Sequence, residues 1–290
     1  KTAYEISLGL VGSEMCIRDR LITGLGVGFA SGLLGVGGCF IMIPVQYYVL
    51  IAEGFDTKVA ILTAFGTNLA VVLPTAMSGS YRHSRKGAVL WRQGIAMGIT
   101  GAITSWIGAY VAQMLPGQIL KVGFGFAILA GAIRMLTAKP VKIEEKPPEN
   151  ILPYVLWAIP LGFACGLIGI GGGVLMVPVM VLALKFRMHQ AVGTSTALMI
   201  FTATGGILAY IYYGLKAVAE NNILLPPYSI GYVNLLQWLL LAATSVPMAQ
   251  VGALTAHKLS GKWLKYIFIA VMVYMALKMI GVFAWLHLPI

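Results

Sequence analysis

The sequence predicts an all-α, polytopic membrane protein built from two homologous repeats, and three observations support this prediction. The 290 residues are 59% hydrophobic and 10% charged, with a mean hydropathy of +0.88, whereas soluble domains carry about 25% charged residues. Several apolar stretches approach or exceed the roughly 20 residues with which a helix crosses a bilayer. The two halves of the chain also share glycine-rich motifs. A water-soluble fold is therefore excluded.

Eight apolar segments follow one another along the chain. Segments 21–52 and 151–184 are longer than one crossing requires, and each contains a glycine cluster. Because each glycine costs a helix about 1 kcal/mol relative to alanine, both segments are predicted to be broken or re-entrant, each made of two half-helices. The other six are predicted as transmembrane helices, three in each repeat: 57–81, 93–114, 118–137, 189–214, 232–257 and 263–286.

Changes in composition divide the chain into four parts. Residues 1–20 carry six charges and no sustained apolar run, so they are predicted to be non-native or disordered. Residues 21–137 form repeat 1. The charged, proline-bearing stretch 138–150 (AKPVKIEEKPPEN) has no apolar periodicity and is predicted to be an exposed linker. Residues 151–290 form repeat 2.

The internal duplication is visible in the sequence itself. GLLGVGGCFIMIPV (32–45) matches GLIGIGGGVLMVPV (166–179), with the glycines and the proline in register. AFGTNLA (64–70) matches AVGTSTA (191–197), and further on Gly108 corresponds to Gly252. Duplicated halves of this kind are typical of membrane transporters.

The basic residues predict how the repeats lie in the membrane. If each broken segment returns to the side from which it entered, the Lys and Arg residues after residue 20 divide 13 to 4 between the two faces; if it crosses once, they divide 10 to 7. The positive-inside rule favours the first arrangement, in which the repeats have inverted orientations and the basic face, with the linker, is cytoplasmic. The 13 are Arg82, Arg85, Lys86, Arg92, Arg134, Lys139, Lys142, Lys146, Lys185, Arg187, Lys258, Lys262 and Lys265, and the four are Lys58, Lys121, Lys216 and Lys278. The expected location is the inner, cytoplasmic membrane.

The glycine clusters are the first candidates for a binding site. Glycines at a helix break expose backbone N–H groups, and the next half-helix adds about half a positive charge at its start, so the break can hold an anion without a buried cation. The alternative is that the glycines only allow helices to pack closely. The predicted substrate-binding residues are Gly35, Gly37, Gly38, Cys39, Thr67, Asn68, Gly169, Gly171, Gly172, Gly173, Thr194 and Ser195.

Simpler interpretations exist for the polar and sulfur-containing members of this set. The hydroxyls of Thr67, Thr194 and Ser195 can bond to carbonyls of their own helices instead of to a substrate, and these two alternatives are equally supported. The amide of Asn68 is harder to satisfy in this way. A thiol such as Cys39 can contact a sulfur substrate, but a small buried hydrophobic role is favoured.

Several classes of function lack the residues they would need. Past residue 20, every Asp and Glu falls between the predicted apolar spans, which points away from cation transport. The cysteines show neither a CxxC spacing nor a histidine cluster, so no metal site and no cofactor is expected. There is no phosphate-binding GK[ST] motif. The net charge of +11 reflects positive-inside loops and does not predict nucleic-acid binding.

The G-x-G-G pattern at Gly35, Gly37 and Gly38, its partner at Gly169–Gly173, the AxGT[NS] elements and the duplicated layout resemble the sulfite exporter (TauE/SafE) family over residues 21–290. The resemblance implies export or uptake of sulfite, organosulfonates or related sulfur anions, coupled to an ion gradient such as a proton gradient. One departure is Cys39, which stands where the second repeat has Gly173.

The leading hypothesis is a secondary transporter, and not an enzyme, that moves a small sulfur-containing oxyanion or organosulfonate of the sulfite, sulfoacetate or thiosulfate class by alternating access. The alternatives are an anion channel and a membrane subunit of a larger complex. The expected partners are the anionic substrate, the lipid bilayer and a coupling ion. The oligomeric state is left open, with a homodimer as one option.

Overall fold

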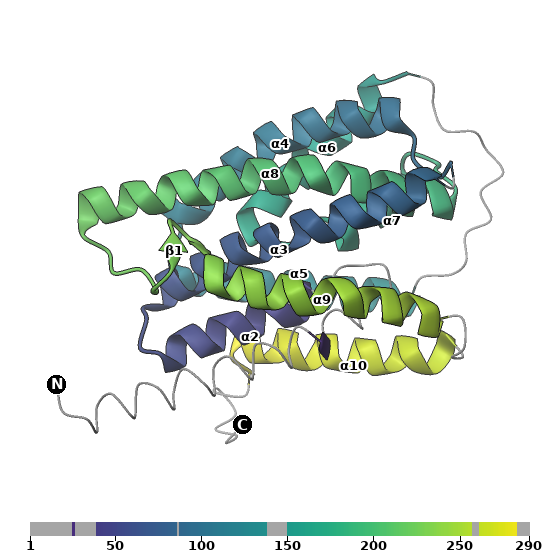
Figure 1. Ribbon diagram of the computed structural model, residues 1–290. Coiled ribbons are helices and arrows are strands. Elements are labelled where there is room, and N and C mark those ends of the chain that lie inside the picture. Colours follow the sequence, from purple (N-terminus) through teal and green to yellow (C-terminus); the bar gives the residue numbers. More distant parts are fainter. Residues whose placement is uncertain (1–24, 27–38, 86, 138–149, 257–260, 283–290) are drawn as a thin grey trace.

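The computed structural model describes residues 25–26, 39–85, 87–137, 150–256 and 261–282, and these are almost entirely helical (Figure 1). The helices are α2 (Cys39–Ala52), α3 (Thr57–Arg85), α4 (Trp91–Met114), α5 (Gly117–Thr137), α6 (Leu152–Ile168), α7 (Gly173–Leu182), α8 (Met188–Asn221), α9 (Leu235–Ala256) and α10 (Gly261–Ile280). A short antiparallel hairpin, β1 (Ser229–Ile230) and β2 (Val233–Asn234), connects α8 to α9.

Four of the described helices are long and apolar enough to cross a membrane, and they lie in α3, α4, α5 and α8. Shorter apolar stretches lie in α2, α6, α9 and α10. The prediction of an all-helical polytopic membrane protein is therefore confirmed. Residues 1–20 and linker residues 138–149 lie outside the described residues.

Two boundaries differ from the predicted segments. Helix α8 continues to Asn221, seven residues beyond the predicted end at 214, so Glu220 belongs to a helix and not to a connection. Hydropathy marks only the lipid-embedded part of a helix, and the exposed last turns of α8 contain an i,i+4 ion pair between Lys216 and Glu220 at 3.6 Å. The predicted segment 232–257 begins too early, because residues 233–234 form β2.

Helices α4, α6 and α8 form one layer through close contacts between small residues. A methyl group at Gly162 would come within 2.6 Å of Gly101 Cα, one at Gly166 within 2.8 Å of Ser105 Cα, and one at Gly205 within 2.9 Å of Ala102 Cα. Small residues permit such close packing of membrane helices. Figure 1 shows this layer in the upper half of the view, with α2, α5, α9 and α10 below and α3 between them.

Helices α3 and α8 run antiparallel. A methyl group at Gly66 would lie 3.1 Å from Tyr210 Cβ, whereas one at Gly79 would lie 3.6 Å from Thr196 Cγ2. The start of α3 thus packs against the second half of α8, and the end of α3 against the start of α8. The two helices carry the matching AFGTNLA and AVGTSTA elements, so corresponding segments of the two halves lie against each other in opposite directions.

The predicted segment 151–184 is broken at its glycines. Helix α6 ends at Ile168 and is followed by Gly169 with φ 61°, and α7 is preceded by Gly172 with φ 92°. Both backbone conformations are left-handed, and glycine adopts them without steric cost. In segment 21–52, which is also predicted to be broken, α2 begins at Cys39; Gly35, Gly37 and Gly38 lie outside the described residues.

The break packs directly against α3. A methyl group at Gly169 would come within 2.7 Å of Phe65 Cα, and one at Gly171 within 2.6 Å of Val72 Cγ1. Part of the glycine requirement here is therefore close packing, as the simpler interpretation proposed. This contact fixes the level of the break relative to the middle of α3.

Replacing Gly171 by alanine tests this contact. The Gly171→Ala variant should be destabilised by about 1–3 kcal/mol, because the added methyl group would overlap Val72. The Gly171→Ala/Val72→Ala double variant should recover part of the loss, measured as a positive coupling in a double-mutant cycle of thermal unfolding in detergent. Gly123→Ala on α5 is the matched control, since no described residue lies within 4 Å of the added atom. Equal destabilisation at Gly123 and Gly171 would contradict the packing described here.

Candidate functional site

The side chain of Asn68 connects the middle of α3 to the break between α6 and α7. It is fully buried, and its Nδ2 donates a hydrogen bond of 2.6 Å to the carbonyl oxygen of Gly169. Its Oδ1 has no hydrogen-bond partner among the residues that the structure describes. Because a buried carbonyl oxygen without a donor is energetically unfavourable, this atom marks a place where a ligand or water can bind.

The backbone amides of the break are also available. Leu175 and Met176 donate to the carbonyl of Gly172, at 3.0 and 2.8 Å. Within the described part of the chain, the amides of Ile170, Gly171 and Gly172 make no hydrogen bond. These amides lie at the start of α7, where the helix dipole adds partial positive charge. The break therefore offers hydrogen-bond donors and a favourable field to an anion.

The hydroxyls of Thr67 and Thr194 make reciprocal contacts between the two halves. Thr67 Oγ1 accepts from the amide of Asn234 at 2.9 Å, and Thr194 Oγ1 accepts from the amide of Leu90 at 3.1 Å. Asn234 and Leu90 each precede a helix, α9 and α4. They are separated by the same number of residues as Gly108 and Gly252, so they occupy corresponding positions. Each threonine therefore holds the start of a helix in the opposite half.

The remaining predicted residues have more local surroundings. Ser195 Oγ donates to Val192 O at 2.9 Å, a bond within its own helix, as the structural alternative for these hydroxyls expected. Cys39 and Cys165 are both buried, and their thiols lie near enough for the charge of one to act on the other. This brings the start of α2 close to the α6–α7 break. Gly173 is the first residue of α7.

Two buried carboxamides were not among the predicted site residues. Gln46 on α2 and Gln237 on α9 are 3% and 0% exposed, and in the described part of the chain neither side chain has a hydrogen-bond partner. The available sequence signal was a strongly polar residue inside an apolar segment, which for an uncharged side chain is weak. The described residues contain no cluster of His, Cys, Asp and Glu able to hold a metal ion.

Two lysines approach α2 at its C-terminal end. Lys121 Nζ lies 5.6 Å from the ring centroid of Tyr47, and Lys278 Nζ lies 4.9 Å from that of Tyr48. Tyr48 also donates a hydrogen bond of 2.8 Å to the carbonyl of Lys278. The two tyrosines directly follow Gln46 in sequence, so these cations can attract anions toward that end of the bundle.

Comparisons with known proteins identify the family of the chain. Residues 21–279 match the family model of the sulfite exporter TauE/SafE. The chain is 28% identical to a probable membrane transporter protein of Methanocaldococcus jannaschii over 90% of this chain and 94% of the relative. It is 27% identical to one of Haemophilus influenzae, over 89% and 96% of the two chains, and 30% identical to YunE of Bacillus subtilis, over 67% and 78%.

No solved structure matches the chain. The family match covers most of the sequence. The relatives of Methanocaldococcus jannaschii and Haemophilus influenzae, both named probable membrane transporter proteins, match this chain over nearly their whole length. The chain is thus a multi-pass membrane transporter and not an enzyme, and it belongs to the sulfite exporter TauE/SafE family.

Proposed function

We propose that this protein is a secondary transporter that moves a small sulfur-containing oxyanion or organosulfonate, of the sulfite, thiosulfate or sulfoacetate class, across the cytoplasmic membrane by alternating access. The observation on which the proposal rests is the run of unpaired amides at Ile170–Gly172, beside the buried and half-paired amide of Asn68. Membership of a family named for sulfite export supports the substrate class.

The chemistry of the site suits an anion better than a cation. Unpaired N–H groups and the start of α7 provide donors and partial positive charge, whereas a cation site in a membrane is normally built from carboxylates. Such a site leaves no full charge buried when it is empty. Dissociation of the substrate therefore leaves no buried Lys or Arg without a counter-ion. Such a site suits a carrier that must bind its substrate on one side and release it on the other.

We infer that the two repeats have inverted orientations and that each broken segment is a re-entrant hairpin. The antiparallel packing of α3 and α8 supports the inversion, since these are corresponding helices of the two repeats. The rings of Tyr154 and Phe186, 5.6 Å apart, support the hairpin. Tyr154 lies at the start of α6 and Phe186 follows α7, so the chain leaves this segment at the end where it entered.

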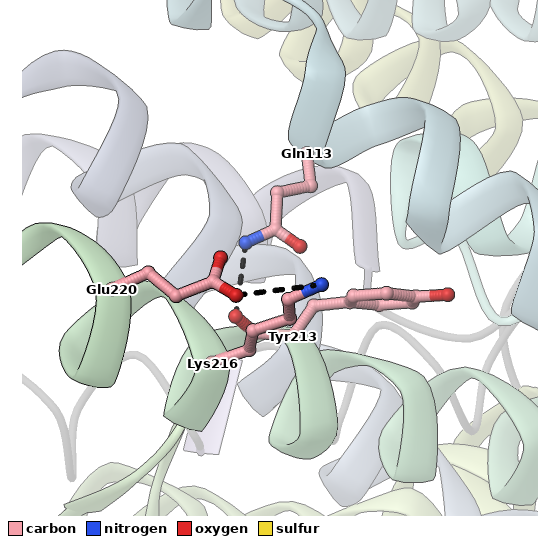
Figure 2. Close-up of polar contacts among 4 residues, drawn as sticks. All are labelled: Gln113, Tyr213, Lys216 and Glu220. Atoms are coloured by element: carbon pink, nitrogen blue, oxygen red, sulfur yellow. Dashed lines mark hydrogen bonds and ion pairs between the residues drawn. The ribbon is translucent and has the colours of Figure 1, made fainter.

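The charges at the two ends support a cytoplasmic location of the basic face. With the hairpin in place, the linker and the loops before α4, α8 and α10 share the face that carries 13 basic residues. At the opposite end, one of the four lysines, Lys216, is paired with Glu220, beside the 2.9 Å bond from Gln113 Nε2 to the carbonyl of Tyr213 (Figure 2).

Cysteine labelling tests the topology. In a variant whose native cysteines are replaced by serine, Arg187→Cys and Asn221→Cys each place one thiol at an exposed end of α8. A membrane-impermeant maleimide should label Asn221→Cys in intact cells, and Arg187→Cys only after the membrane is opened. Arg92→Cys is a second cytoplasmic site, which should behave as Arg187→Cys does. Labelling of all three from outside, or the reverse pattern, would contradict the proposed orientation.

Flux measurements test the transport activity. Purified protein in liposomes should take up labelled sulfite with saturable kinetics that depend on an imposed ion gradient, whereas a channel would conduct without coupling. Asn68→Leu should lower uptake at least about tenfold, because it removes a hydrogen-bonding group at the site, with a smaller loss of folded protein. Thr75→Val is the matched control, since its hydroxyl bonds to the carbonyls of Val71 and Val72 in its own helix. Equal losses of uptake and folded yield in Asn68→Leu would support a purely structural role.

A further inference from the structure

Three buried carboxamides carry hydrogen-bonding atoms that no described residue satisfies. Both polar atoms of Gln46, both of Gln237 and the Oδ1 of Asn68 are without a partner, and the three side chains are at most 3% exposed. We call Gln46, Asn68 and Gln237 the carboxamide layer. Unpaired polar atoms in a dry interior are destabilising, so five of them in three side chains indicate a binding role.

The packing of their helices places the three side chains at one level. Met42 on α2, Val71 on α3 and Leu241 on α9 form a buried cluster. Each carboxamide lies one helical turn from a member of this cluster, on the same face of its helix: Gln46 is four residues after Met42, Asn68 three before Val71, and Gln237 four before Leu241.

The three displacements from the cluster have the same direction. Helices α3 and α9 run in parallel, because Thr67 bonds to Asn234 and Ala70 to Trp238. Helix α2 runs the opposite way, since only a four-residue turn separates it from α3. Moving forward along α2 and backward along α3 and α9 therefore leads to one end of the bundle. The three side chains of the carboxamide layer therefore lie on the same side of the cluster, and the bond from Asn68 to Gly169 places them beside the α6–α7 break.

The layer differs chemically from the break, because it offers acceptors as well as donors. The side-chain amide of Asn68 uses Nδ2 to bond the Gly169 carbonyl, so its unused atom is an acceptor. Gln46 and Gln237 each contribute one acceptor and two N–H donors, whichever way their amides are oriented. A fully ionised oxyanion can accept the donors but has no proton for the acceptors. A protonated oxyanion can satisfy both.

We propose that the carboxamide layer binds the protonated, singly charged form of the oxyanion, such as hydrogen sulfite, so that the coupled proton crosses the membrane on the substrate itself. This inference rests on the proposed function and specifies its substrate. The hydroxyl of the bound anion donates to a carboxamide oxygen, while its other oxygens accept from carboxamide and backbone N–H groups. One transported ion then carries one proton and one negative charge, and no protein group changes its protonation.

The surrounding residues agree with transport of the proton on the substrate. Among the described residues, the titratable groups on the layer's helices and around them include Cys39, Tyr47, Tyr48, Lys121, Cys165, Tyr210, Tyr232, Tyr274 and Lys278, and the carboxylate nearest to Gln46 in sequence is Asp56. Asp56 lies exposed in the turn after α2, where it acts electrostatically on Tyr47, and the buried members of this set are thiols and phenols, not the carboxylic acids or imidazoles that normally relay protons in membrane transporters. The singly charged form also requires less compensation in a site without a full positive charge.

The pH dependence of uptake distinguishes the two ionisation states. Initial rates of labelled sulfite uptake into proteoliposomes, corrected for protein-free liposomes, are measured across the pH range in which hydrogen sulfite loses its proton. The KM expressed as hydrogen sulfite should stay constant while the KM for total sulfite rises with pH. Methanesulfonate, an anion of fixed single charge, controls for effects of pH on the protein. A KM that is constant for the dianion, or for total sulfite, would overturn the inference.

Substitutions in the layer separate binding from structure. Gln46→Met and Gln237→Met keep the side-chain length but remove the hydrogen-bonding atoms, so each should raise the KM for hydrogen sulfite about ten- to a hundredfold. Their melting temperatures should be unchanged or higher, because an unpaired buried amide is replaced by an apolar group. Gln93→Met, at the position in α4 that corresponds to Gln237, is the control and should leave KM unchanged.

The outcomes distinguish this inference from the proposed function. A wild-type KM in both Gln46→Met and Gln237→Met, or a loss of uptake that follows a lower melting temperature, would overturn the role of the layer alone. Saturable uptake that does not follow hydrogen sulfite would overturn the form of the substrate and leave the transporter assignment intact. Absence of saturable uptake of any sulfur oxyanion by the unaltered protein would overturn both.

Discussion

The hydrogen bond from Asn68 to the carbonyl of Gly169 is the interaction on which the arrangement of the site depends. It joins the first half of the chain to the helix break of the second half, and backbone without regular hydrogen bonds in a membrane must be enclosed by protein or water. By occupying the carbonyl side of the break, it leaves the N–H groups of the following residues for a ligand. The close packing of Gly169 and Gly171 on α3 holds the same geometry. Packing and anion binding, which the sequence presented as alternatives, are therefore compatible at these glycines.

The two halves exchange equivalent contacts. Thr67 and Thr194 each accept a bond from the residue before a helix of the opposite half. Gly66 and Gly193 lie against the backbone carbonyls of Tyr232 and Ala88, each of which stands two residues before that bonded residue. Movement of one half therefore requires a coordinated change in both. This symmetry does not extend to the polar interior. Gln46 and Gln237 lie toward one end of the bundle, whereas the position corresponding to Gln46 in the second repeat is Met180. An asymmetric interior suits a carrier that binds and releases its substrate under different conditions on the two sides.

The helices and the broken segment 151–184 followed from hydropathy and glycine spacing, because both report on local backbone energetics. The last turns of α8 did not, since they leave the apolar region and are held by helix propensity and an ion pair. Among site residues, Asn68 was predicted as an amide that its own helix could not satisfy. Gln46 and Gln237 were missed because an isolated glutamine in an apolar segment is ambiguous. Only the packing of α2, α3 and α9 brings these two glutamines to one level, because they lie nearly 200 positions apart in the chain.

We propose that the unpaired amides at the break and the carboxamide beside them bind the transported anion. The most direct measurement is a crystal structure with selenite, the heavier analogue of sulfite, located by its anomalous scattering. We expect a selenium peak whose oxygens lie within hydrogen-bonding distance, about 3 Å, of the amide nitrogens of Ile170–Gly172. A peak only beside Lys121 and Lys278, with the amides of the break enclosed by carbon atoms, would contradict anion binding at the break.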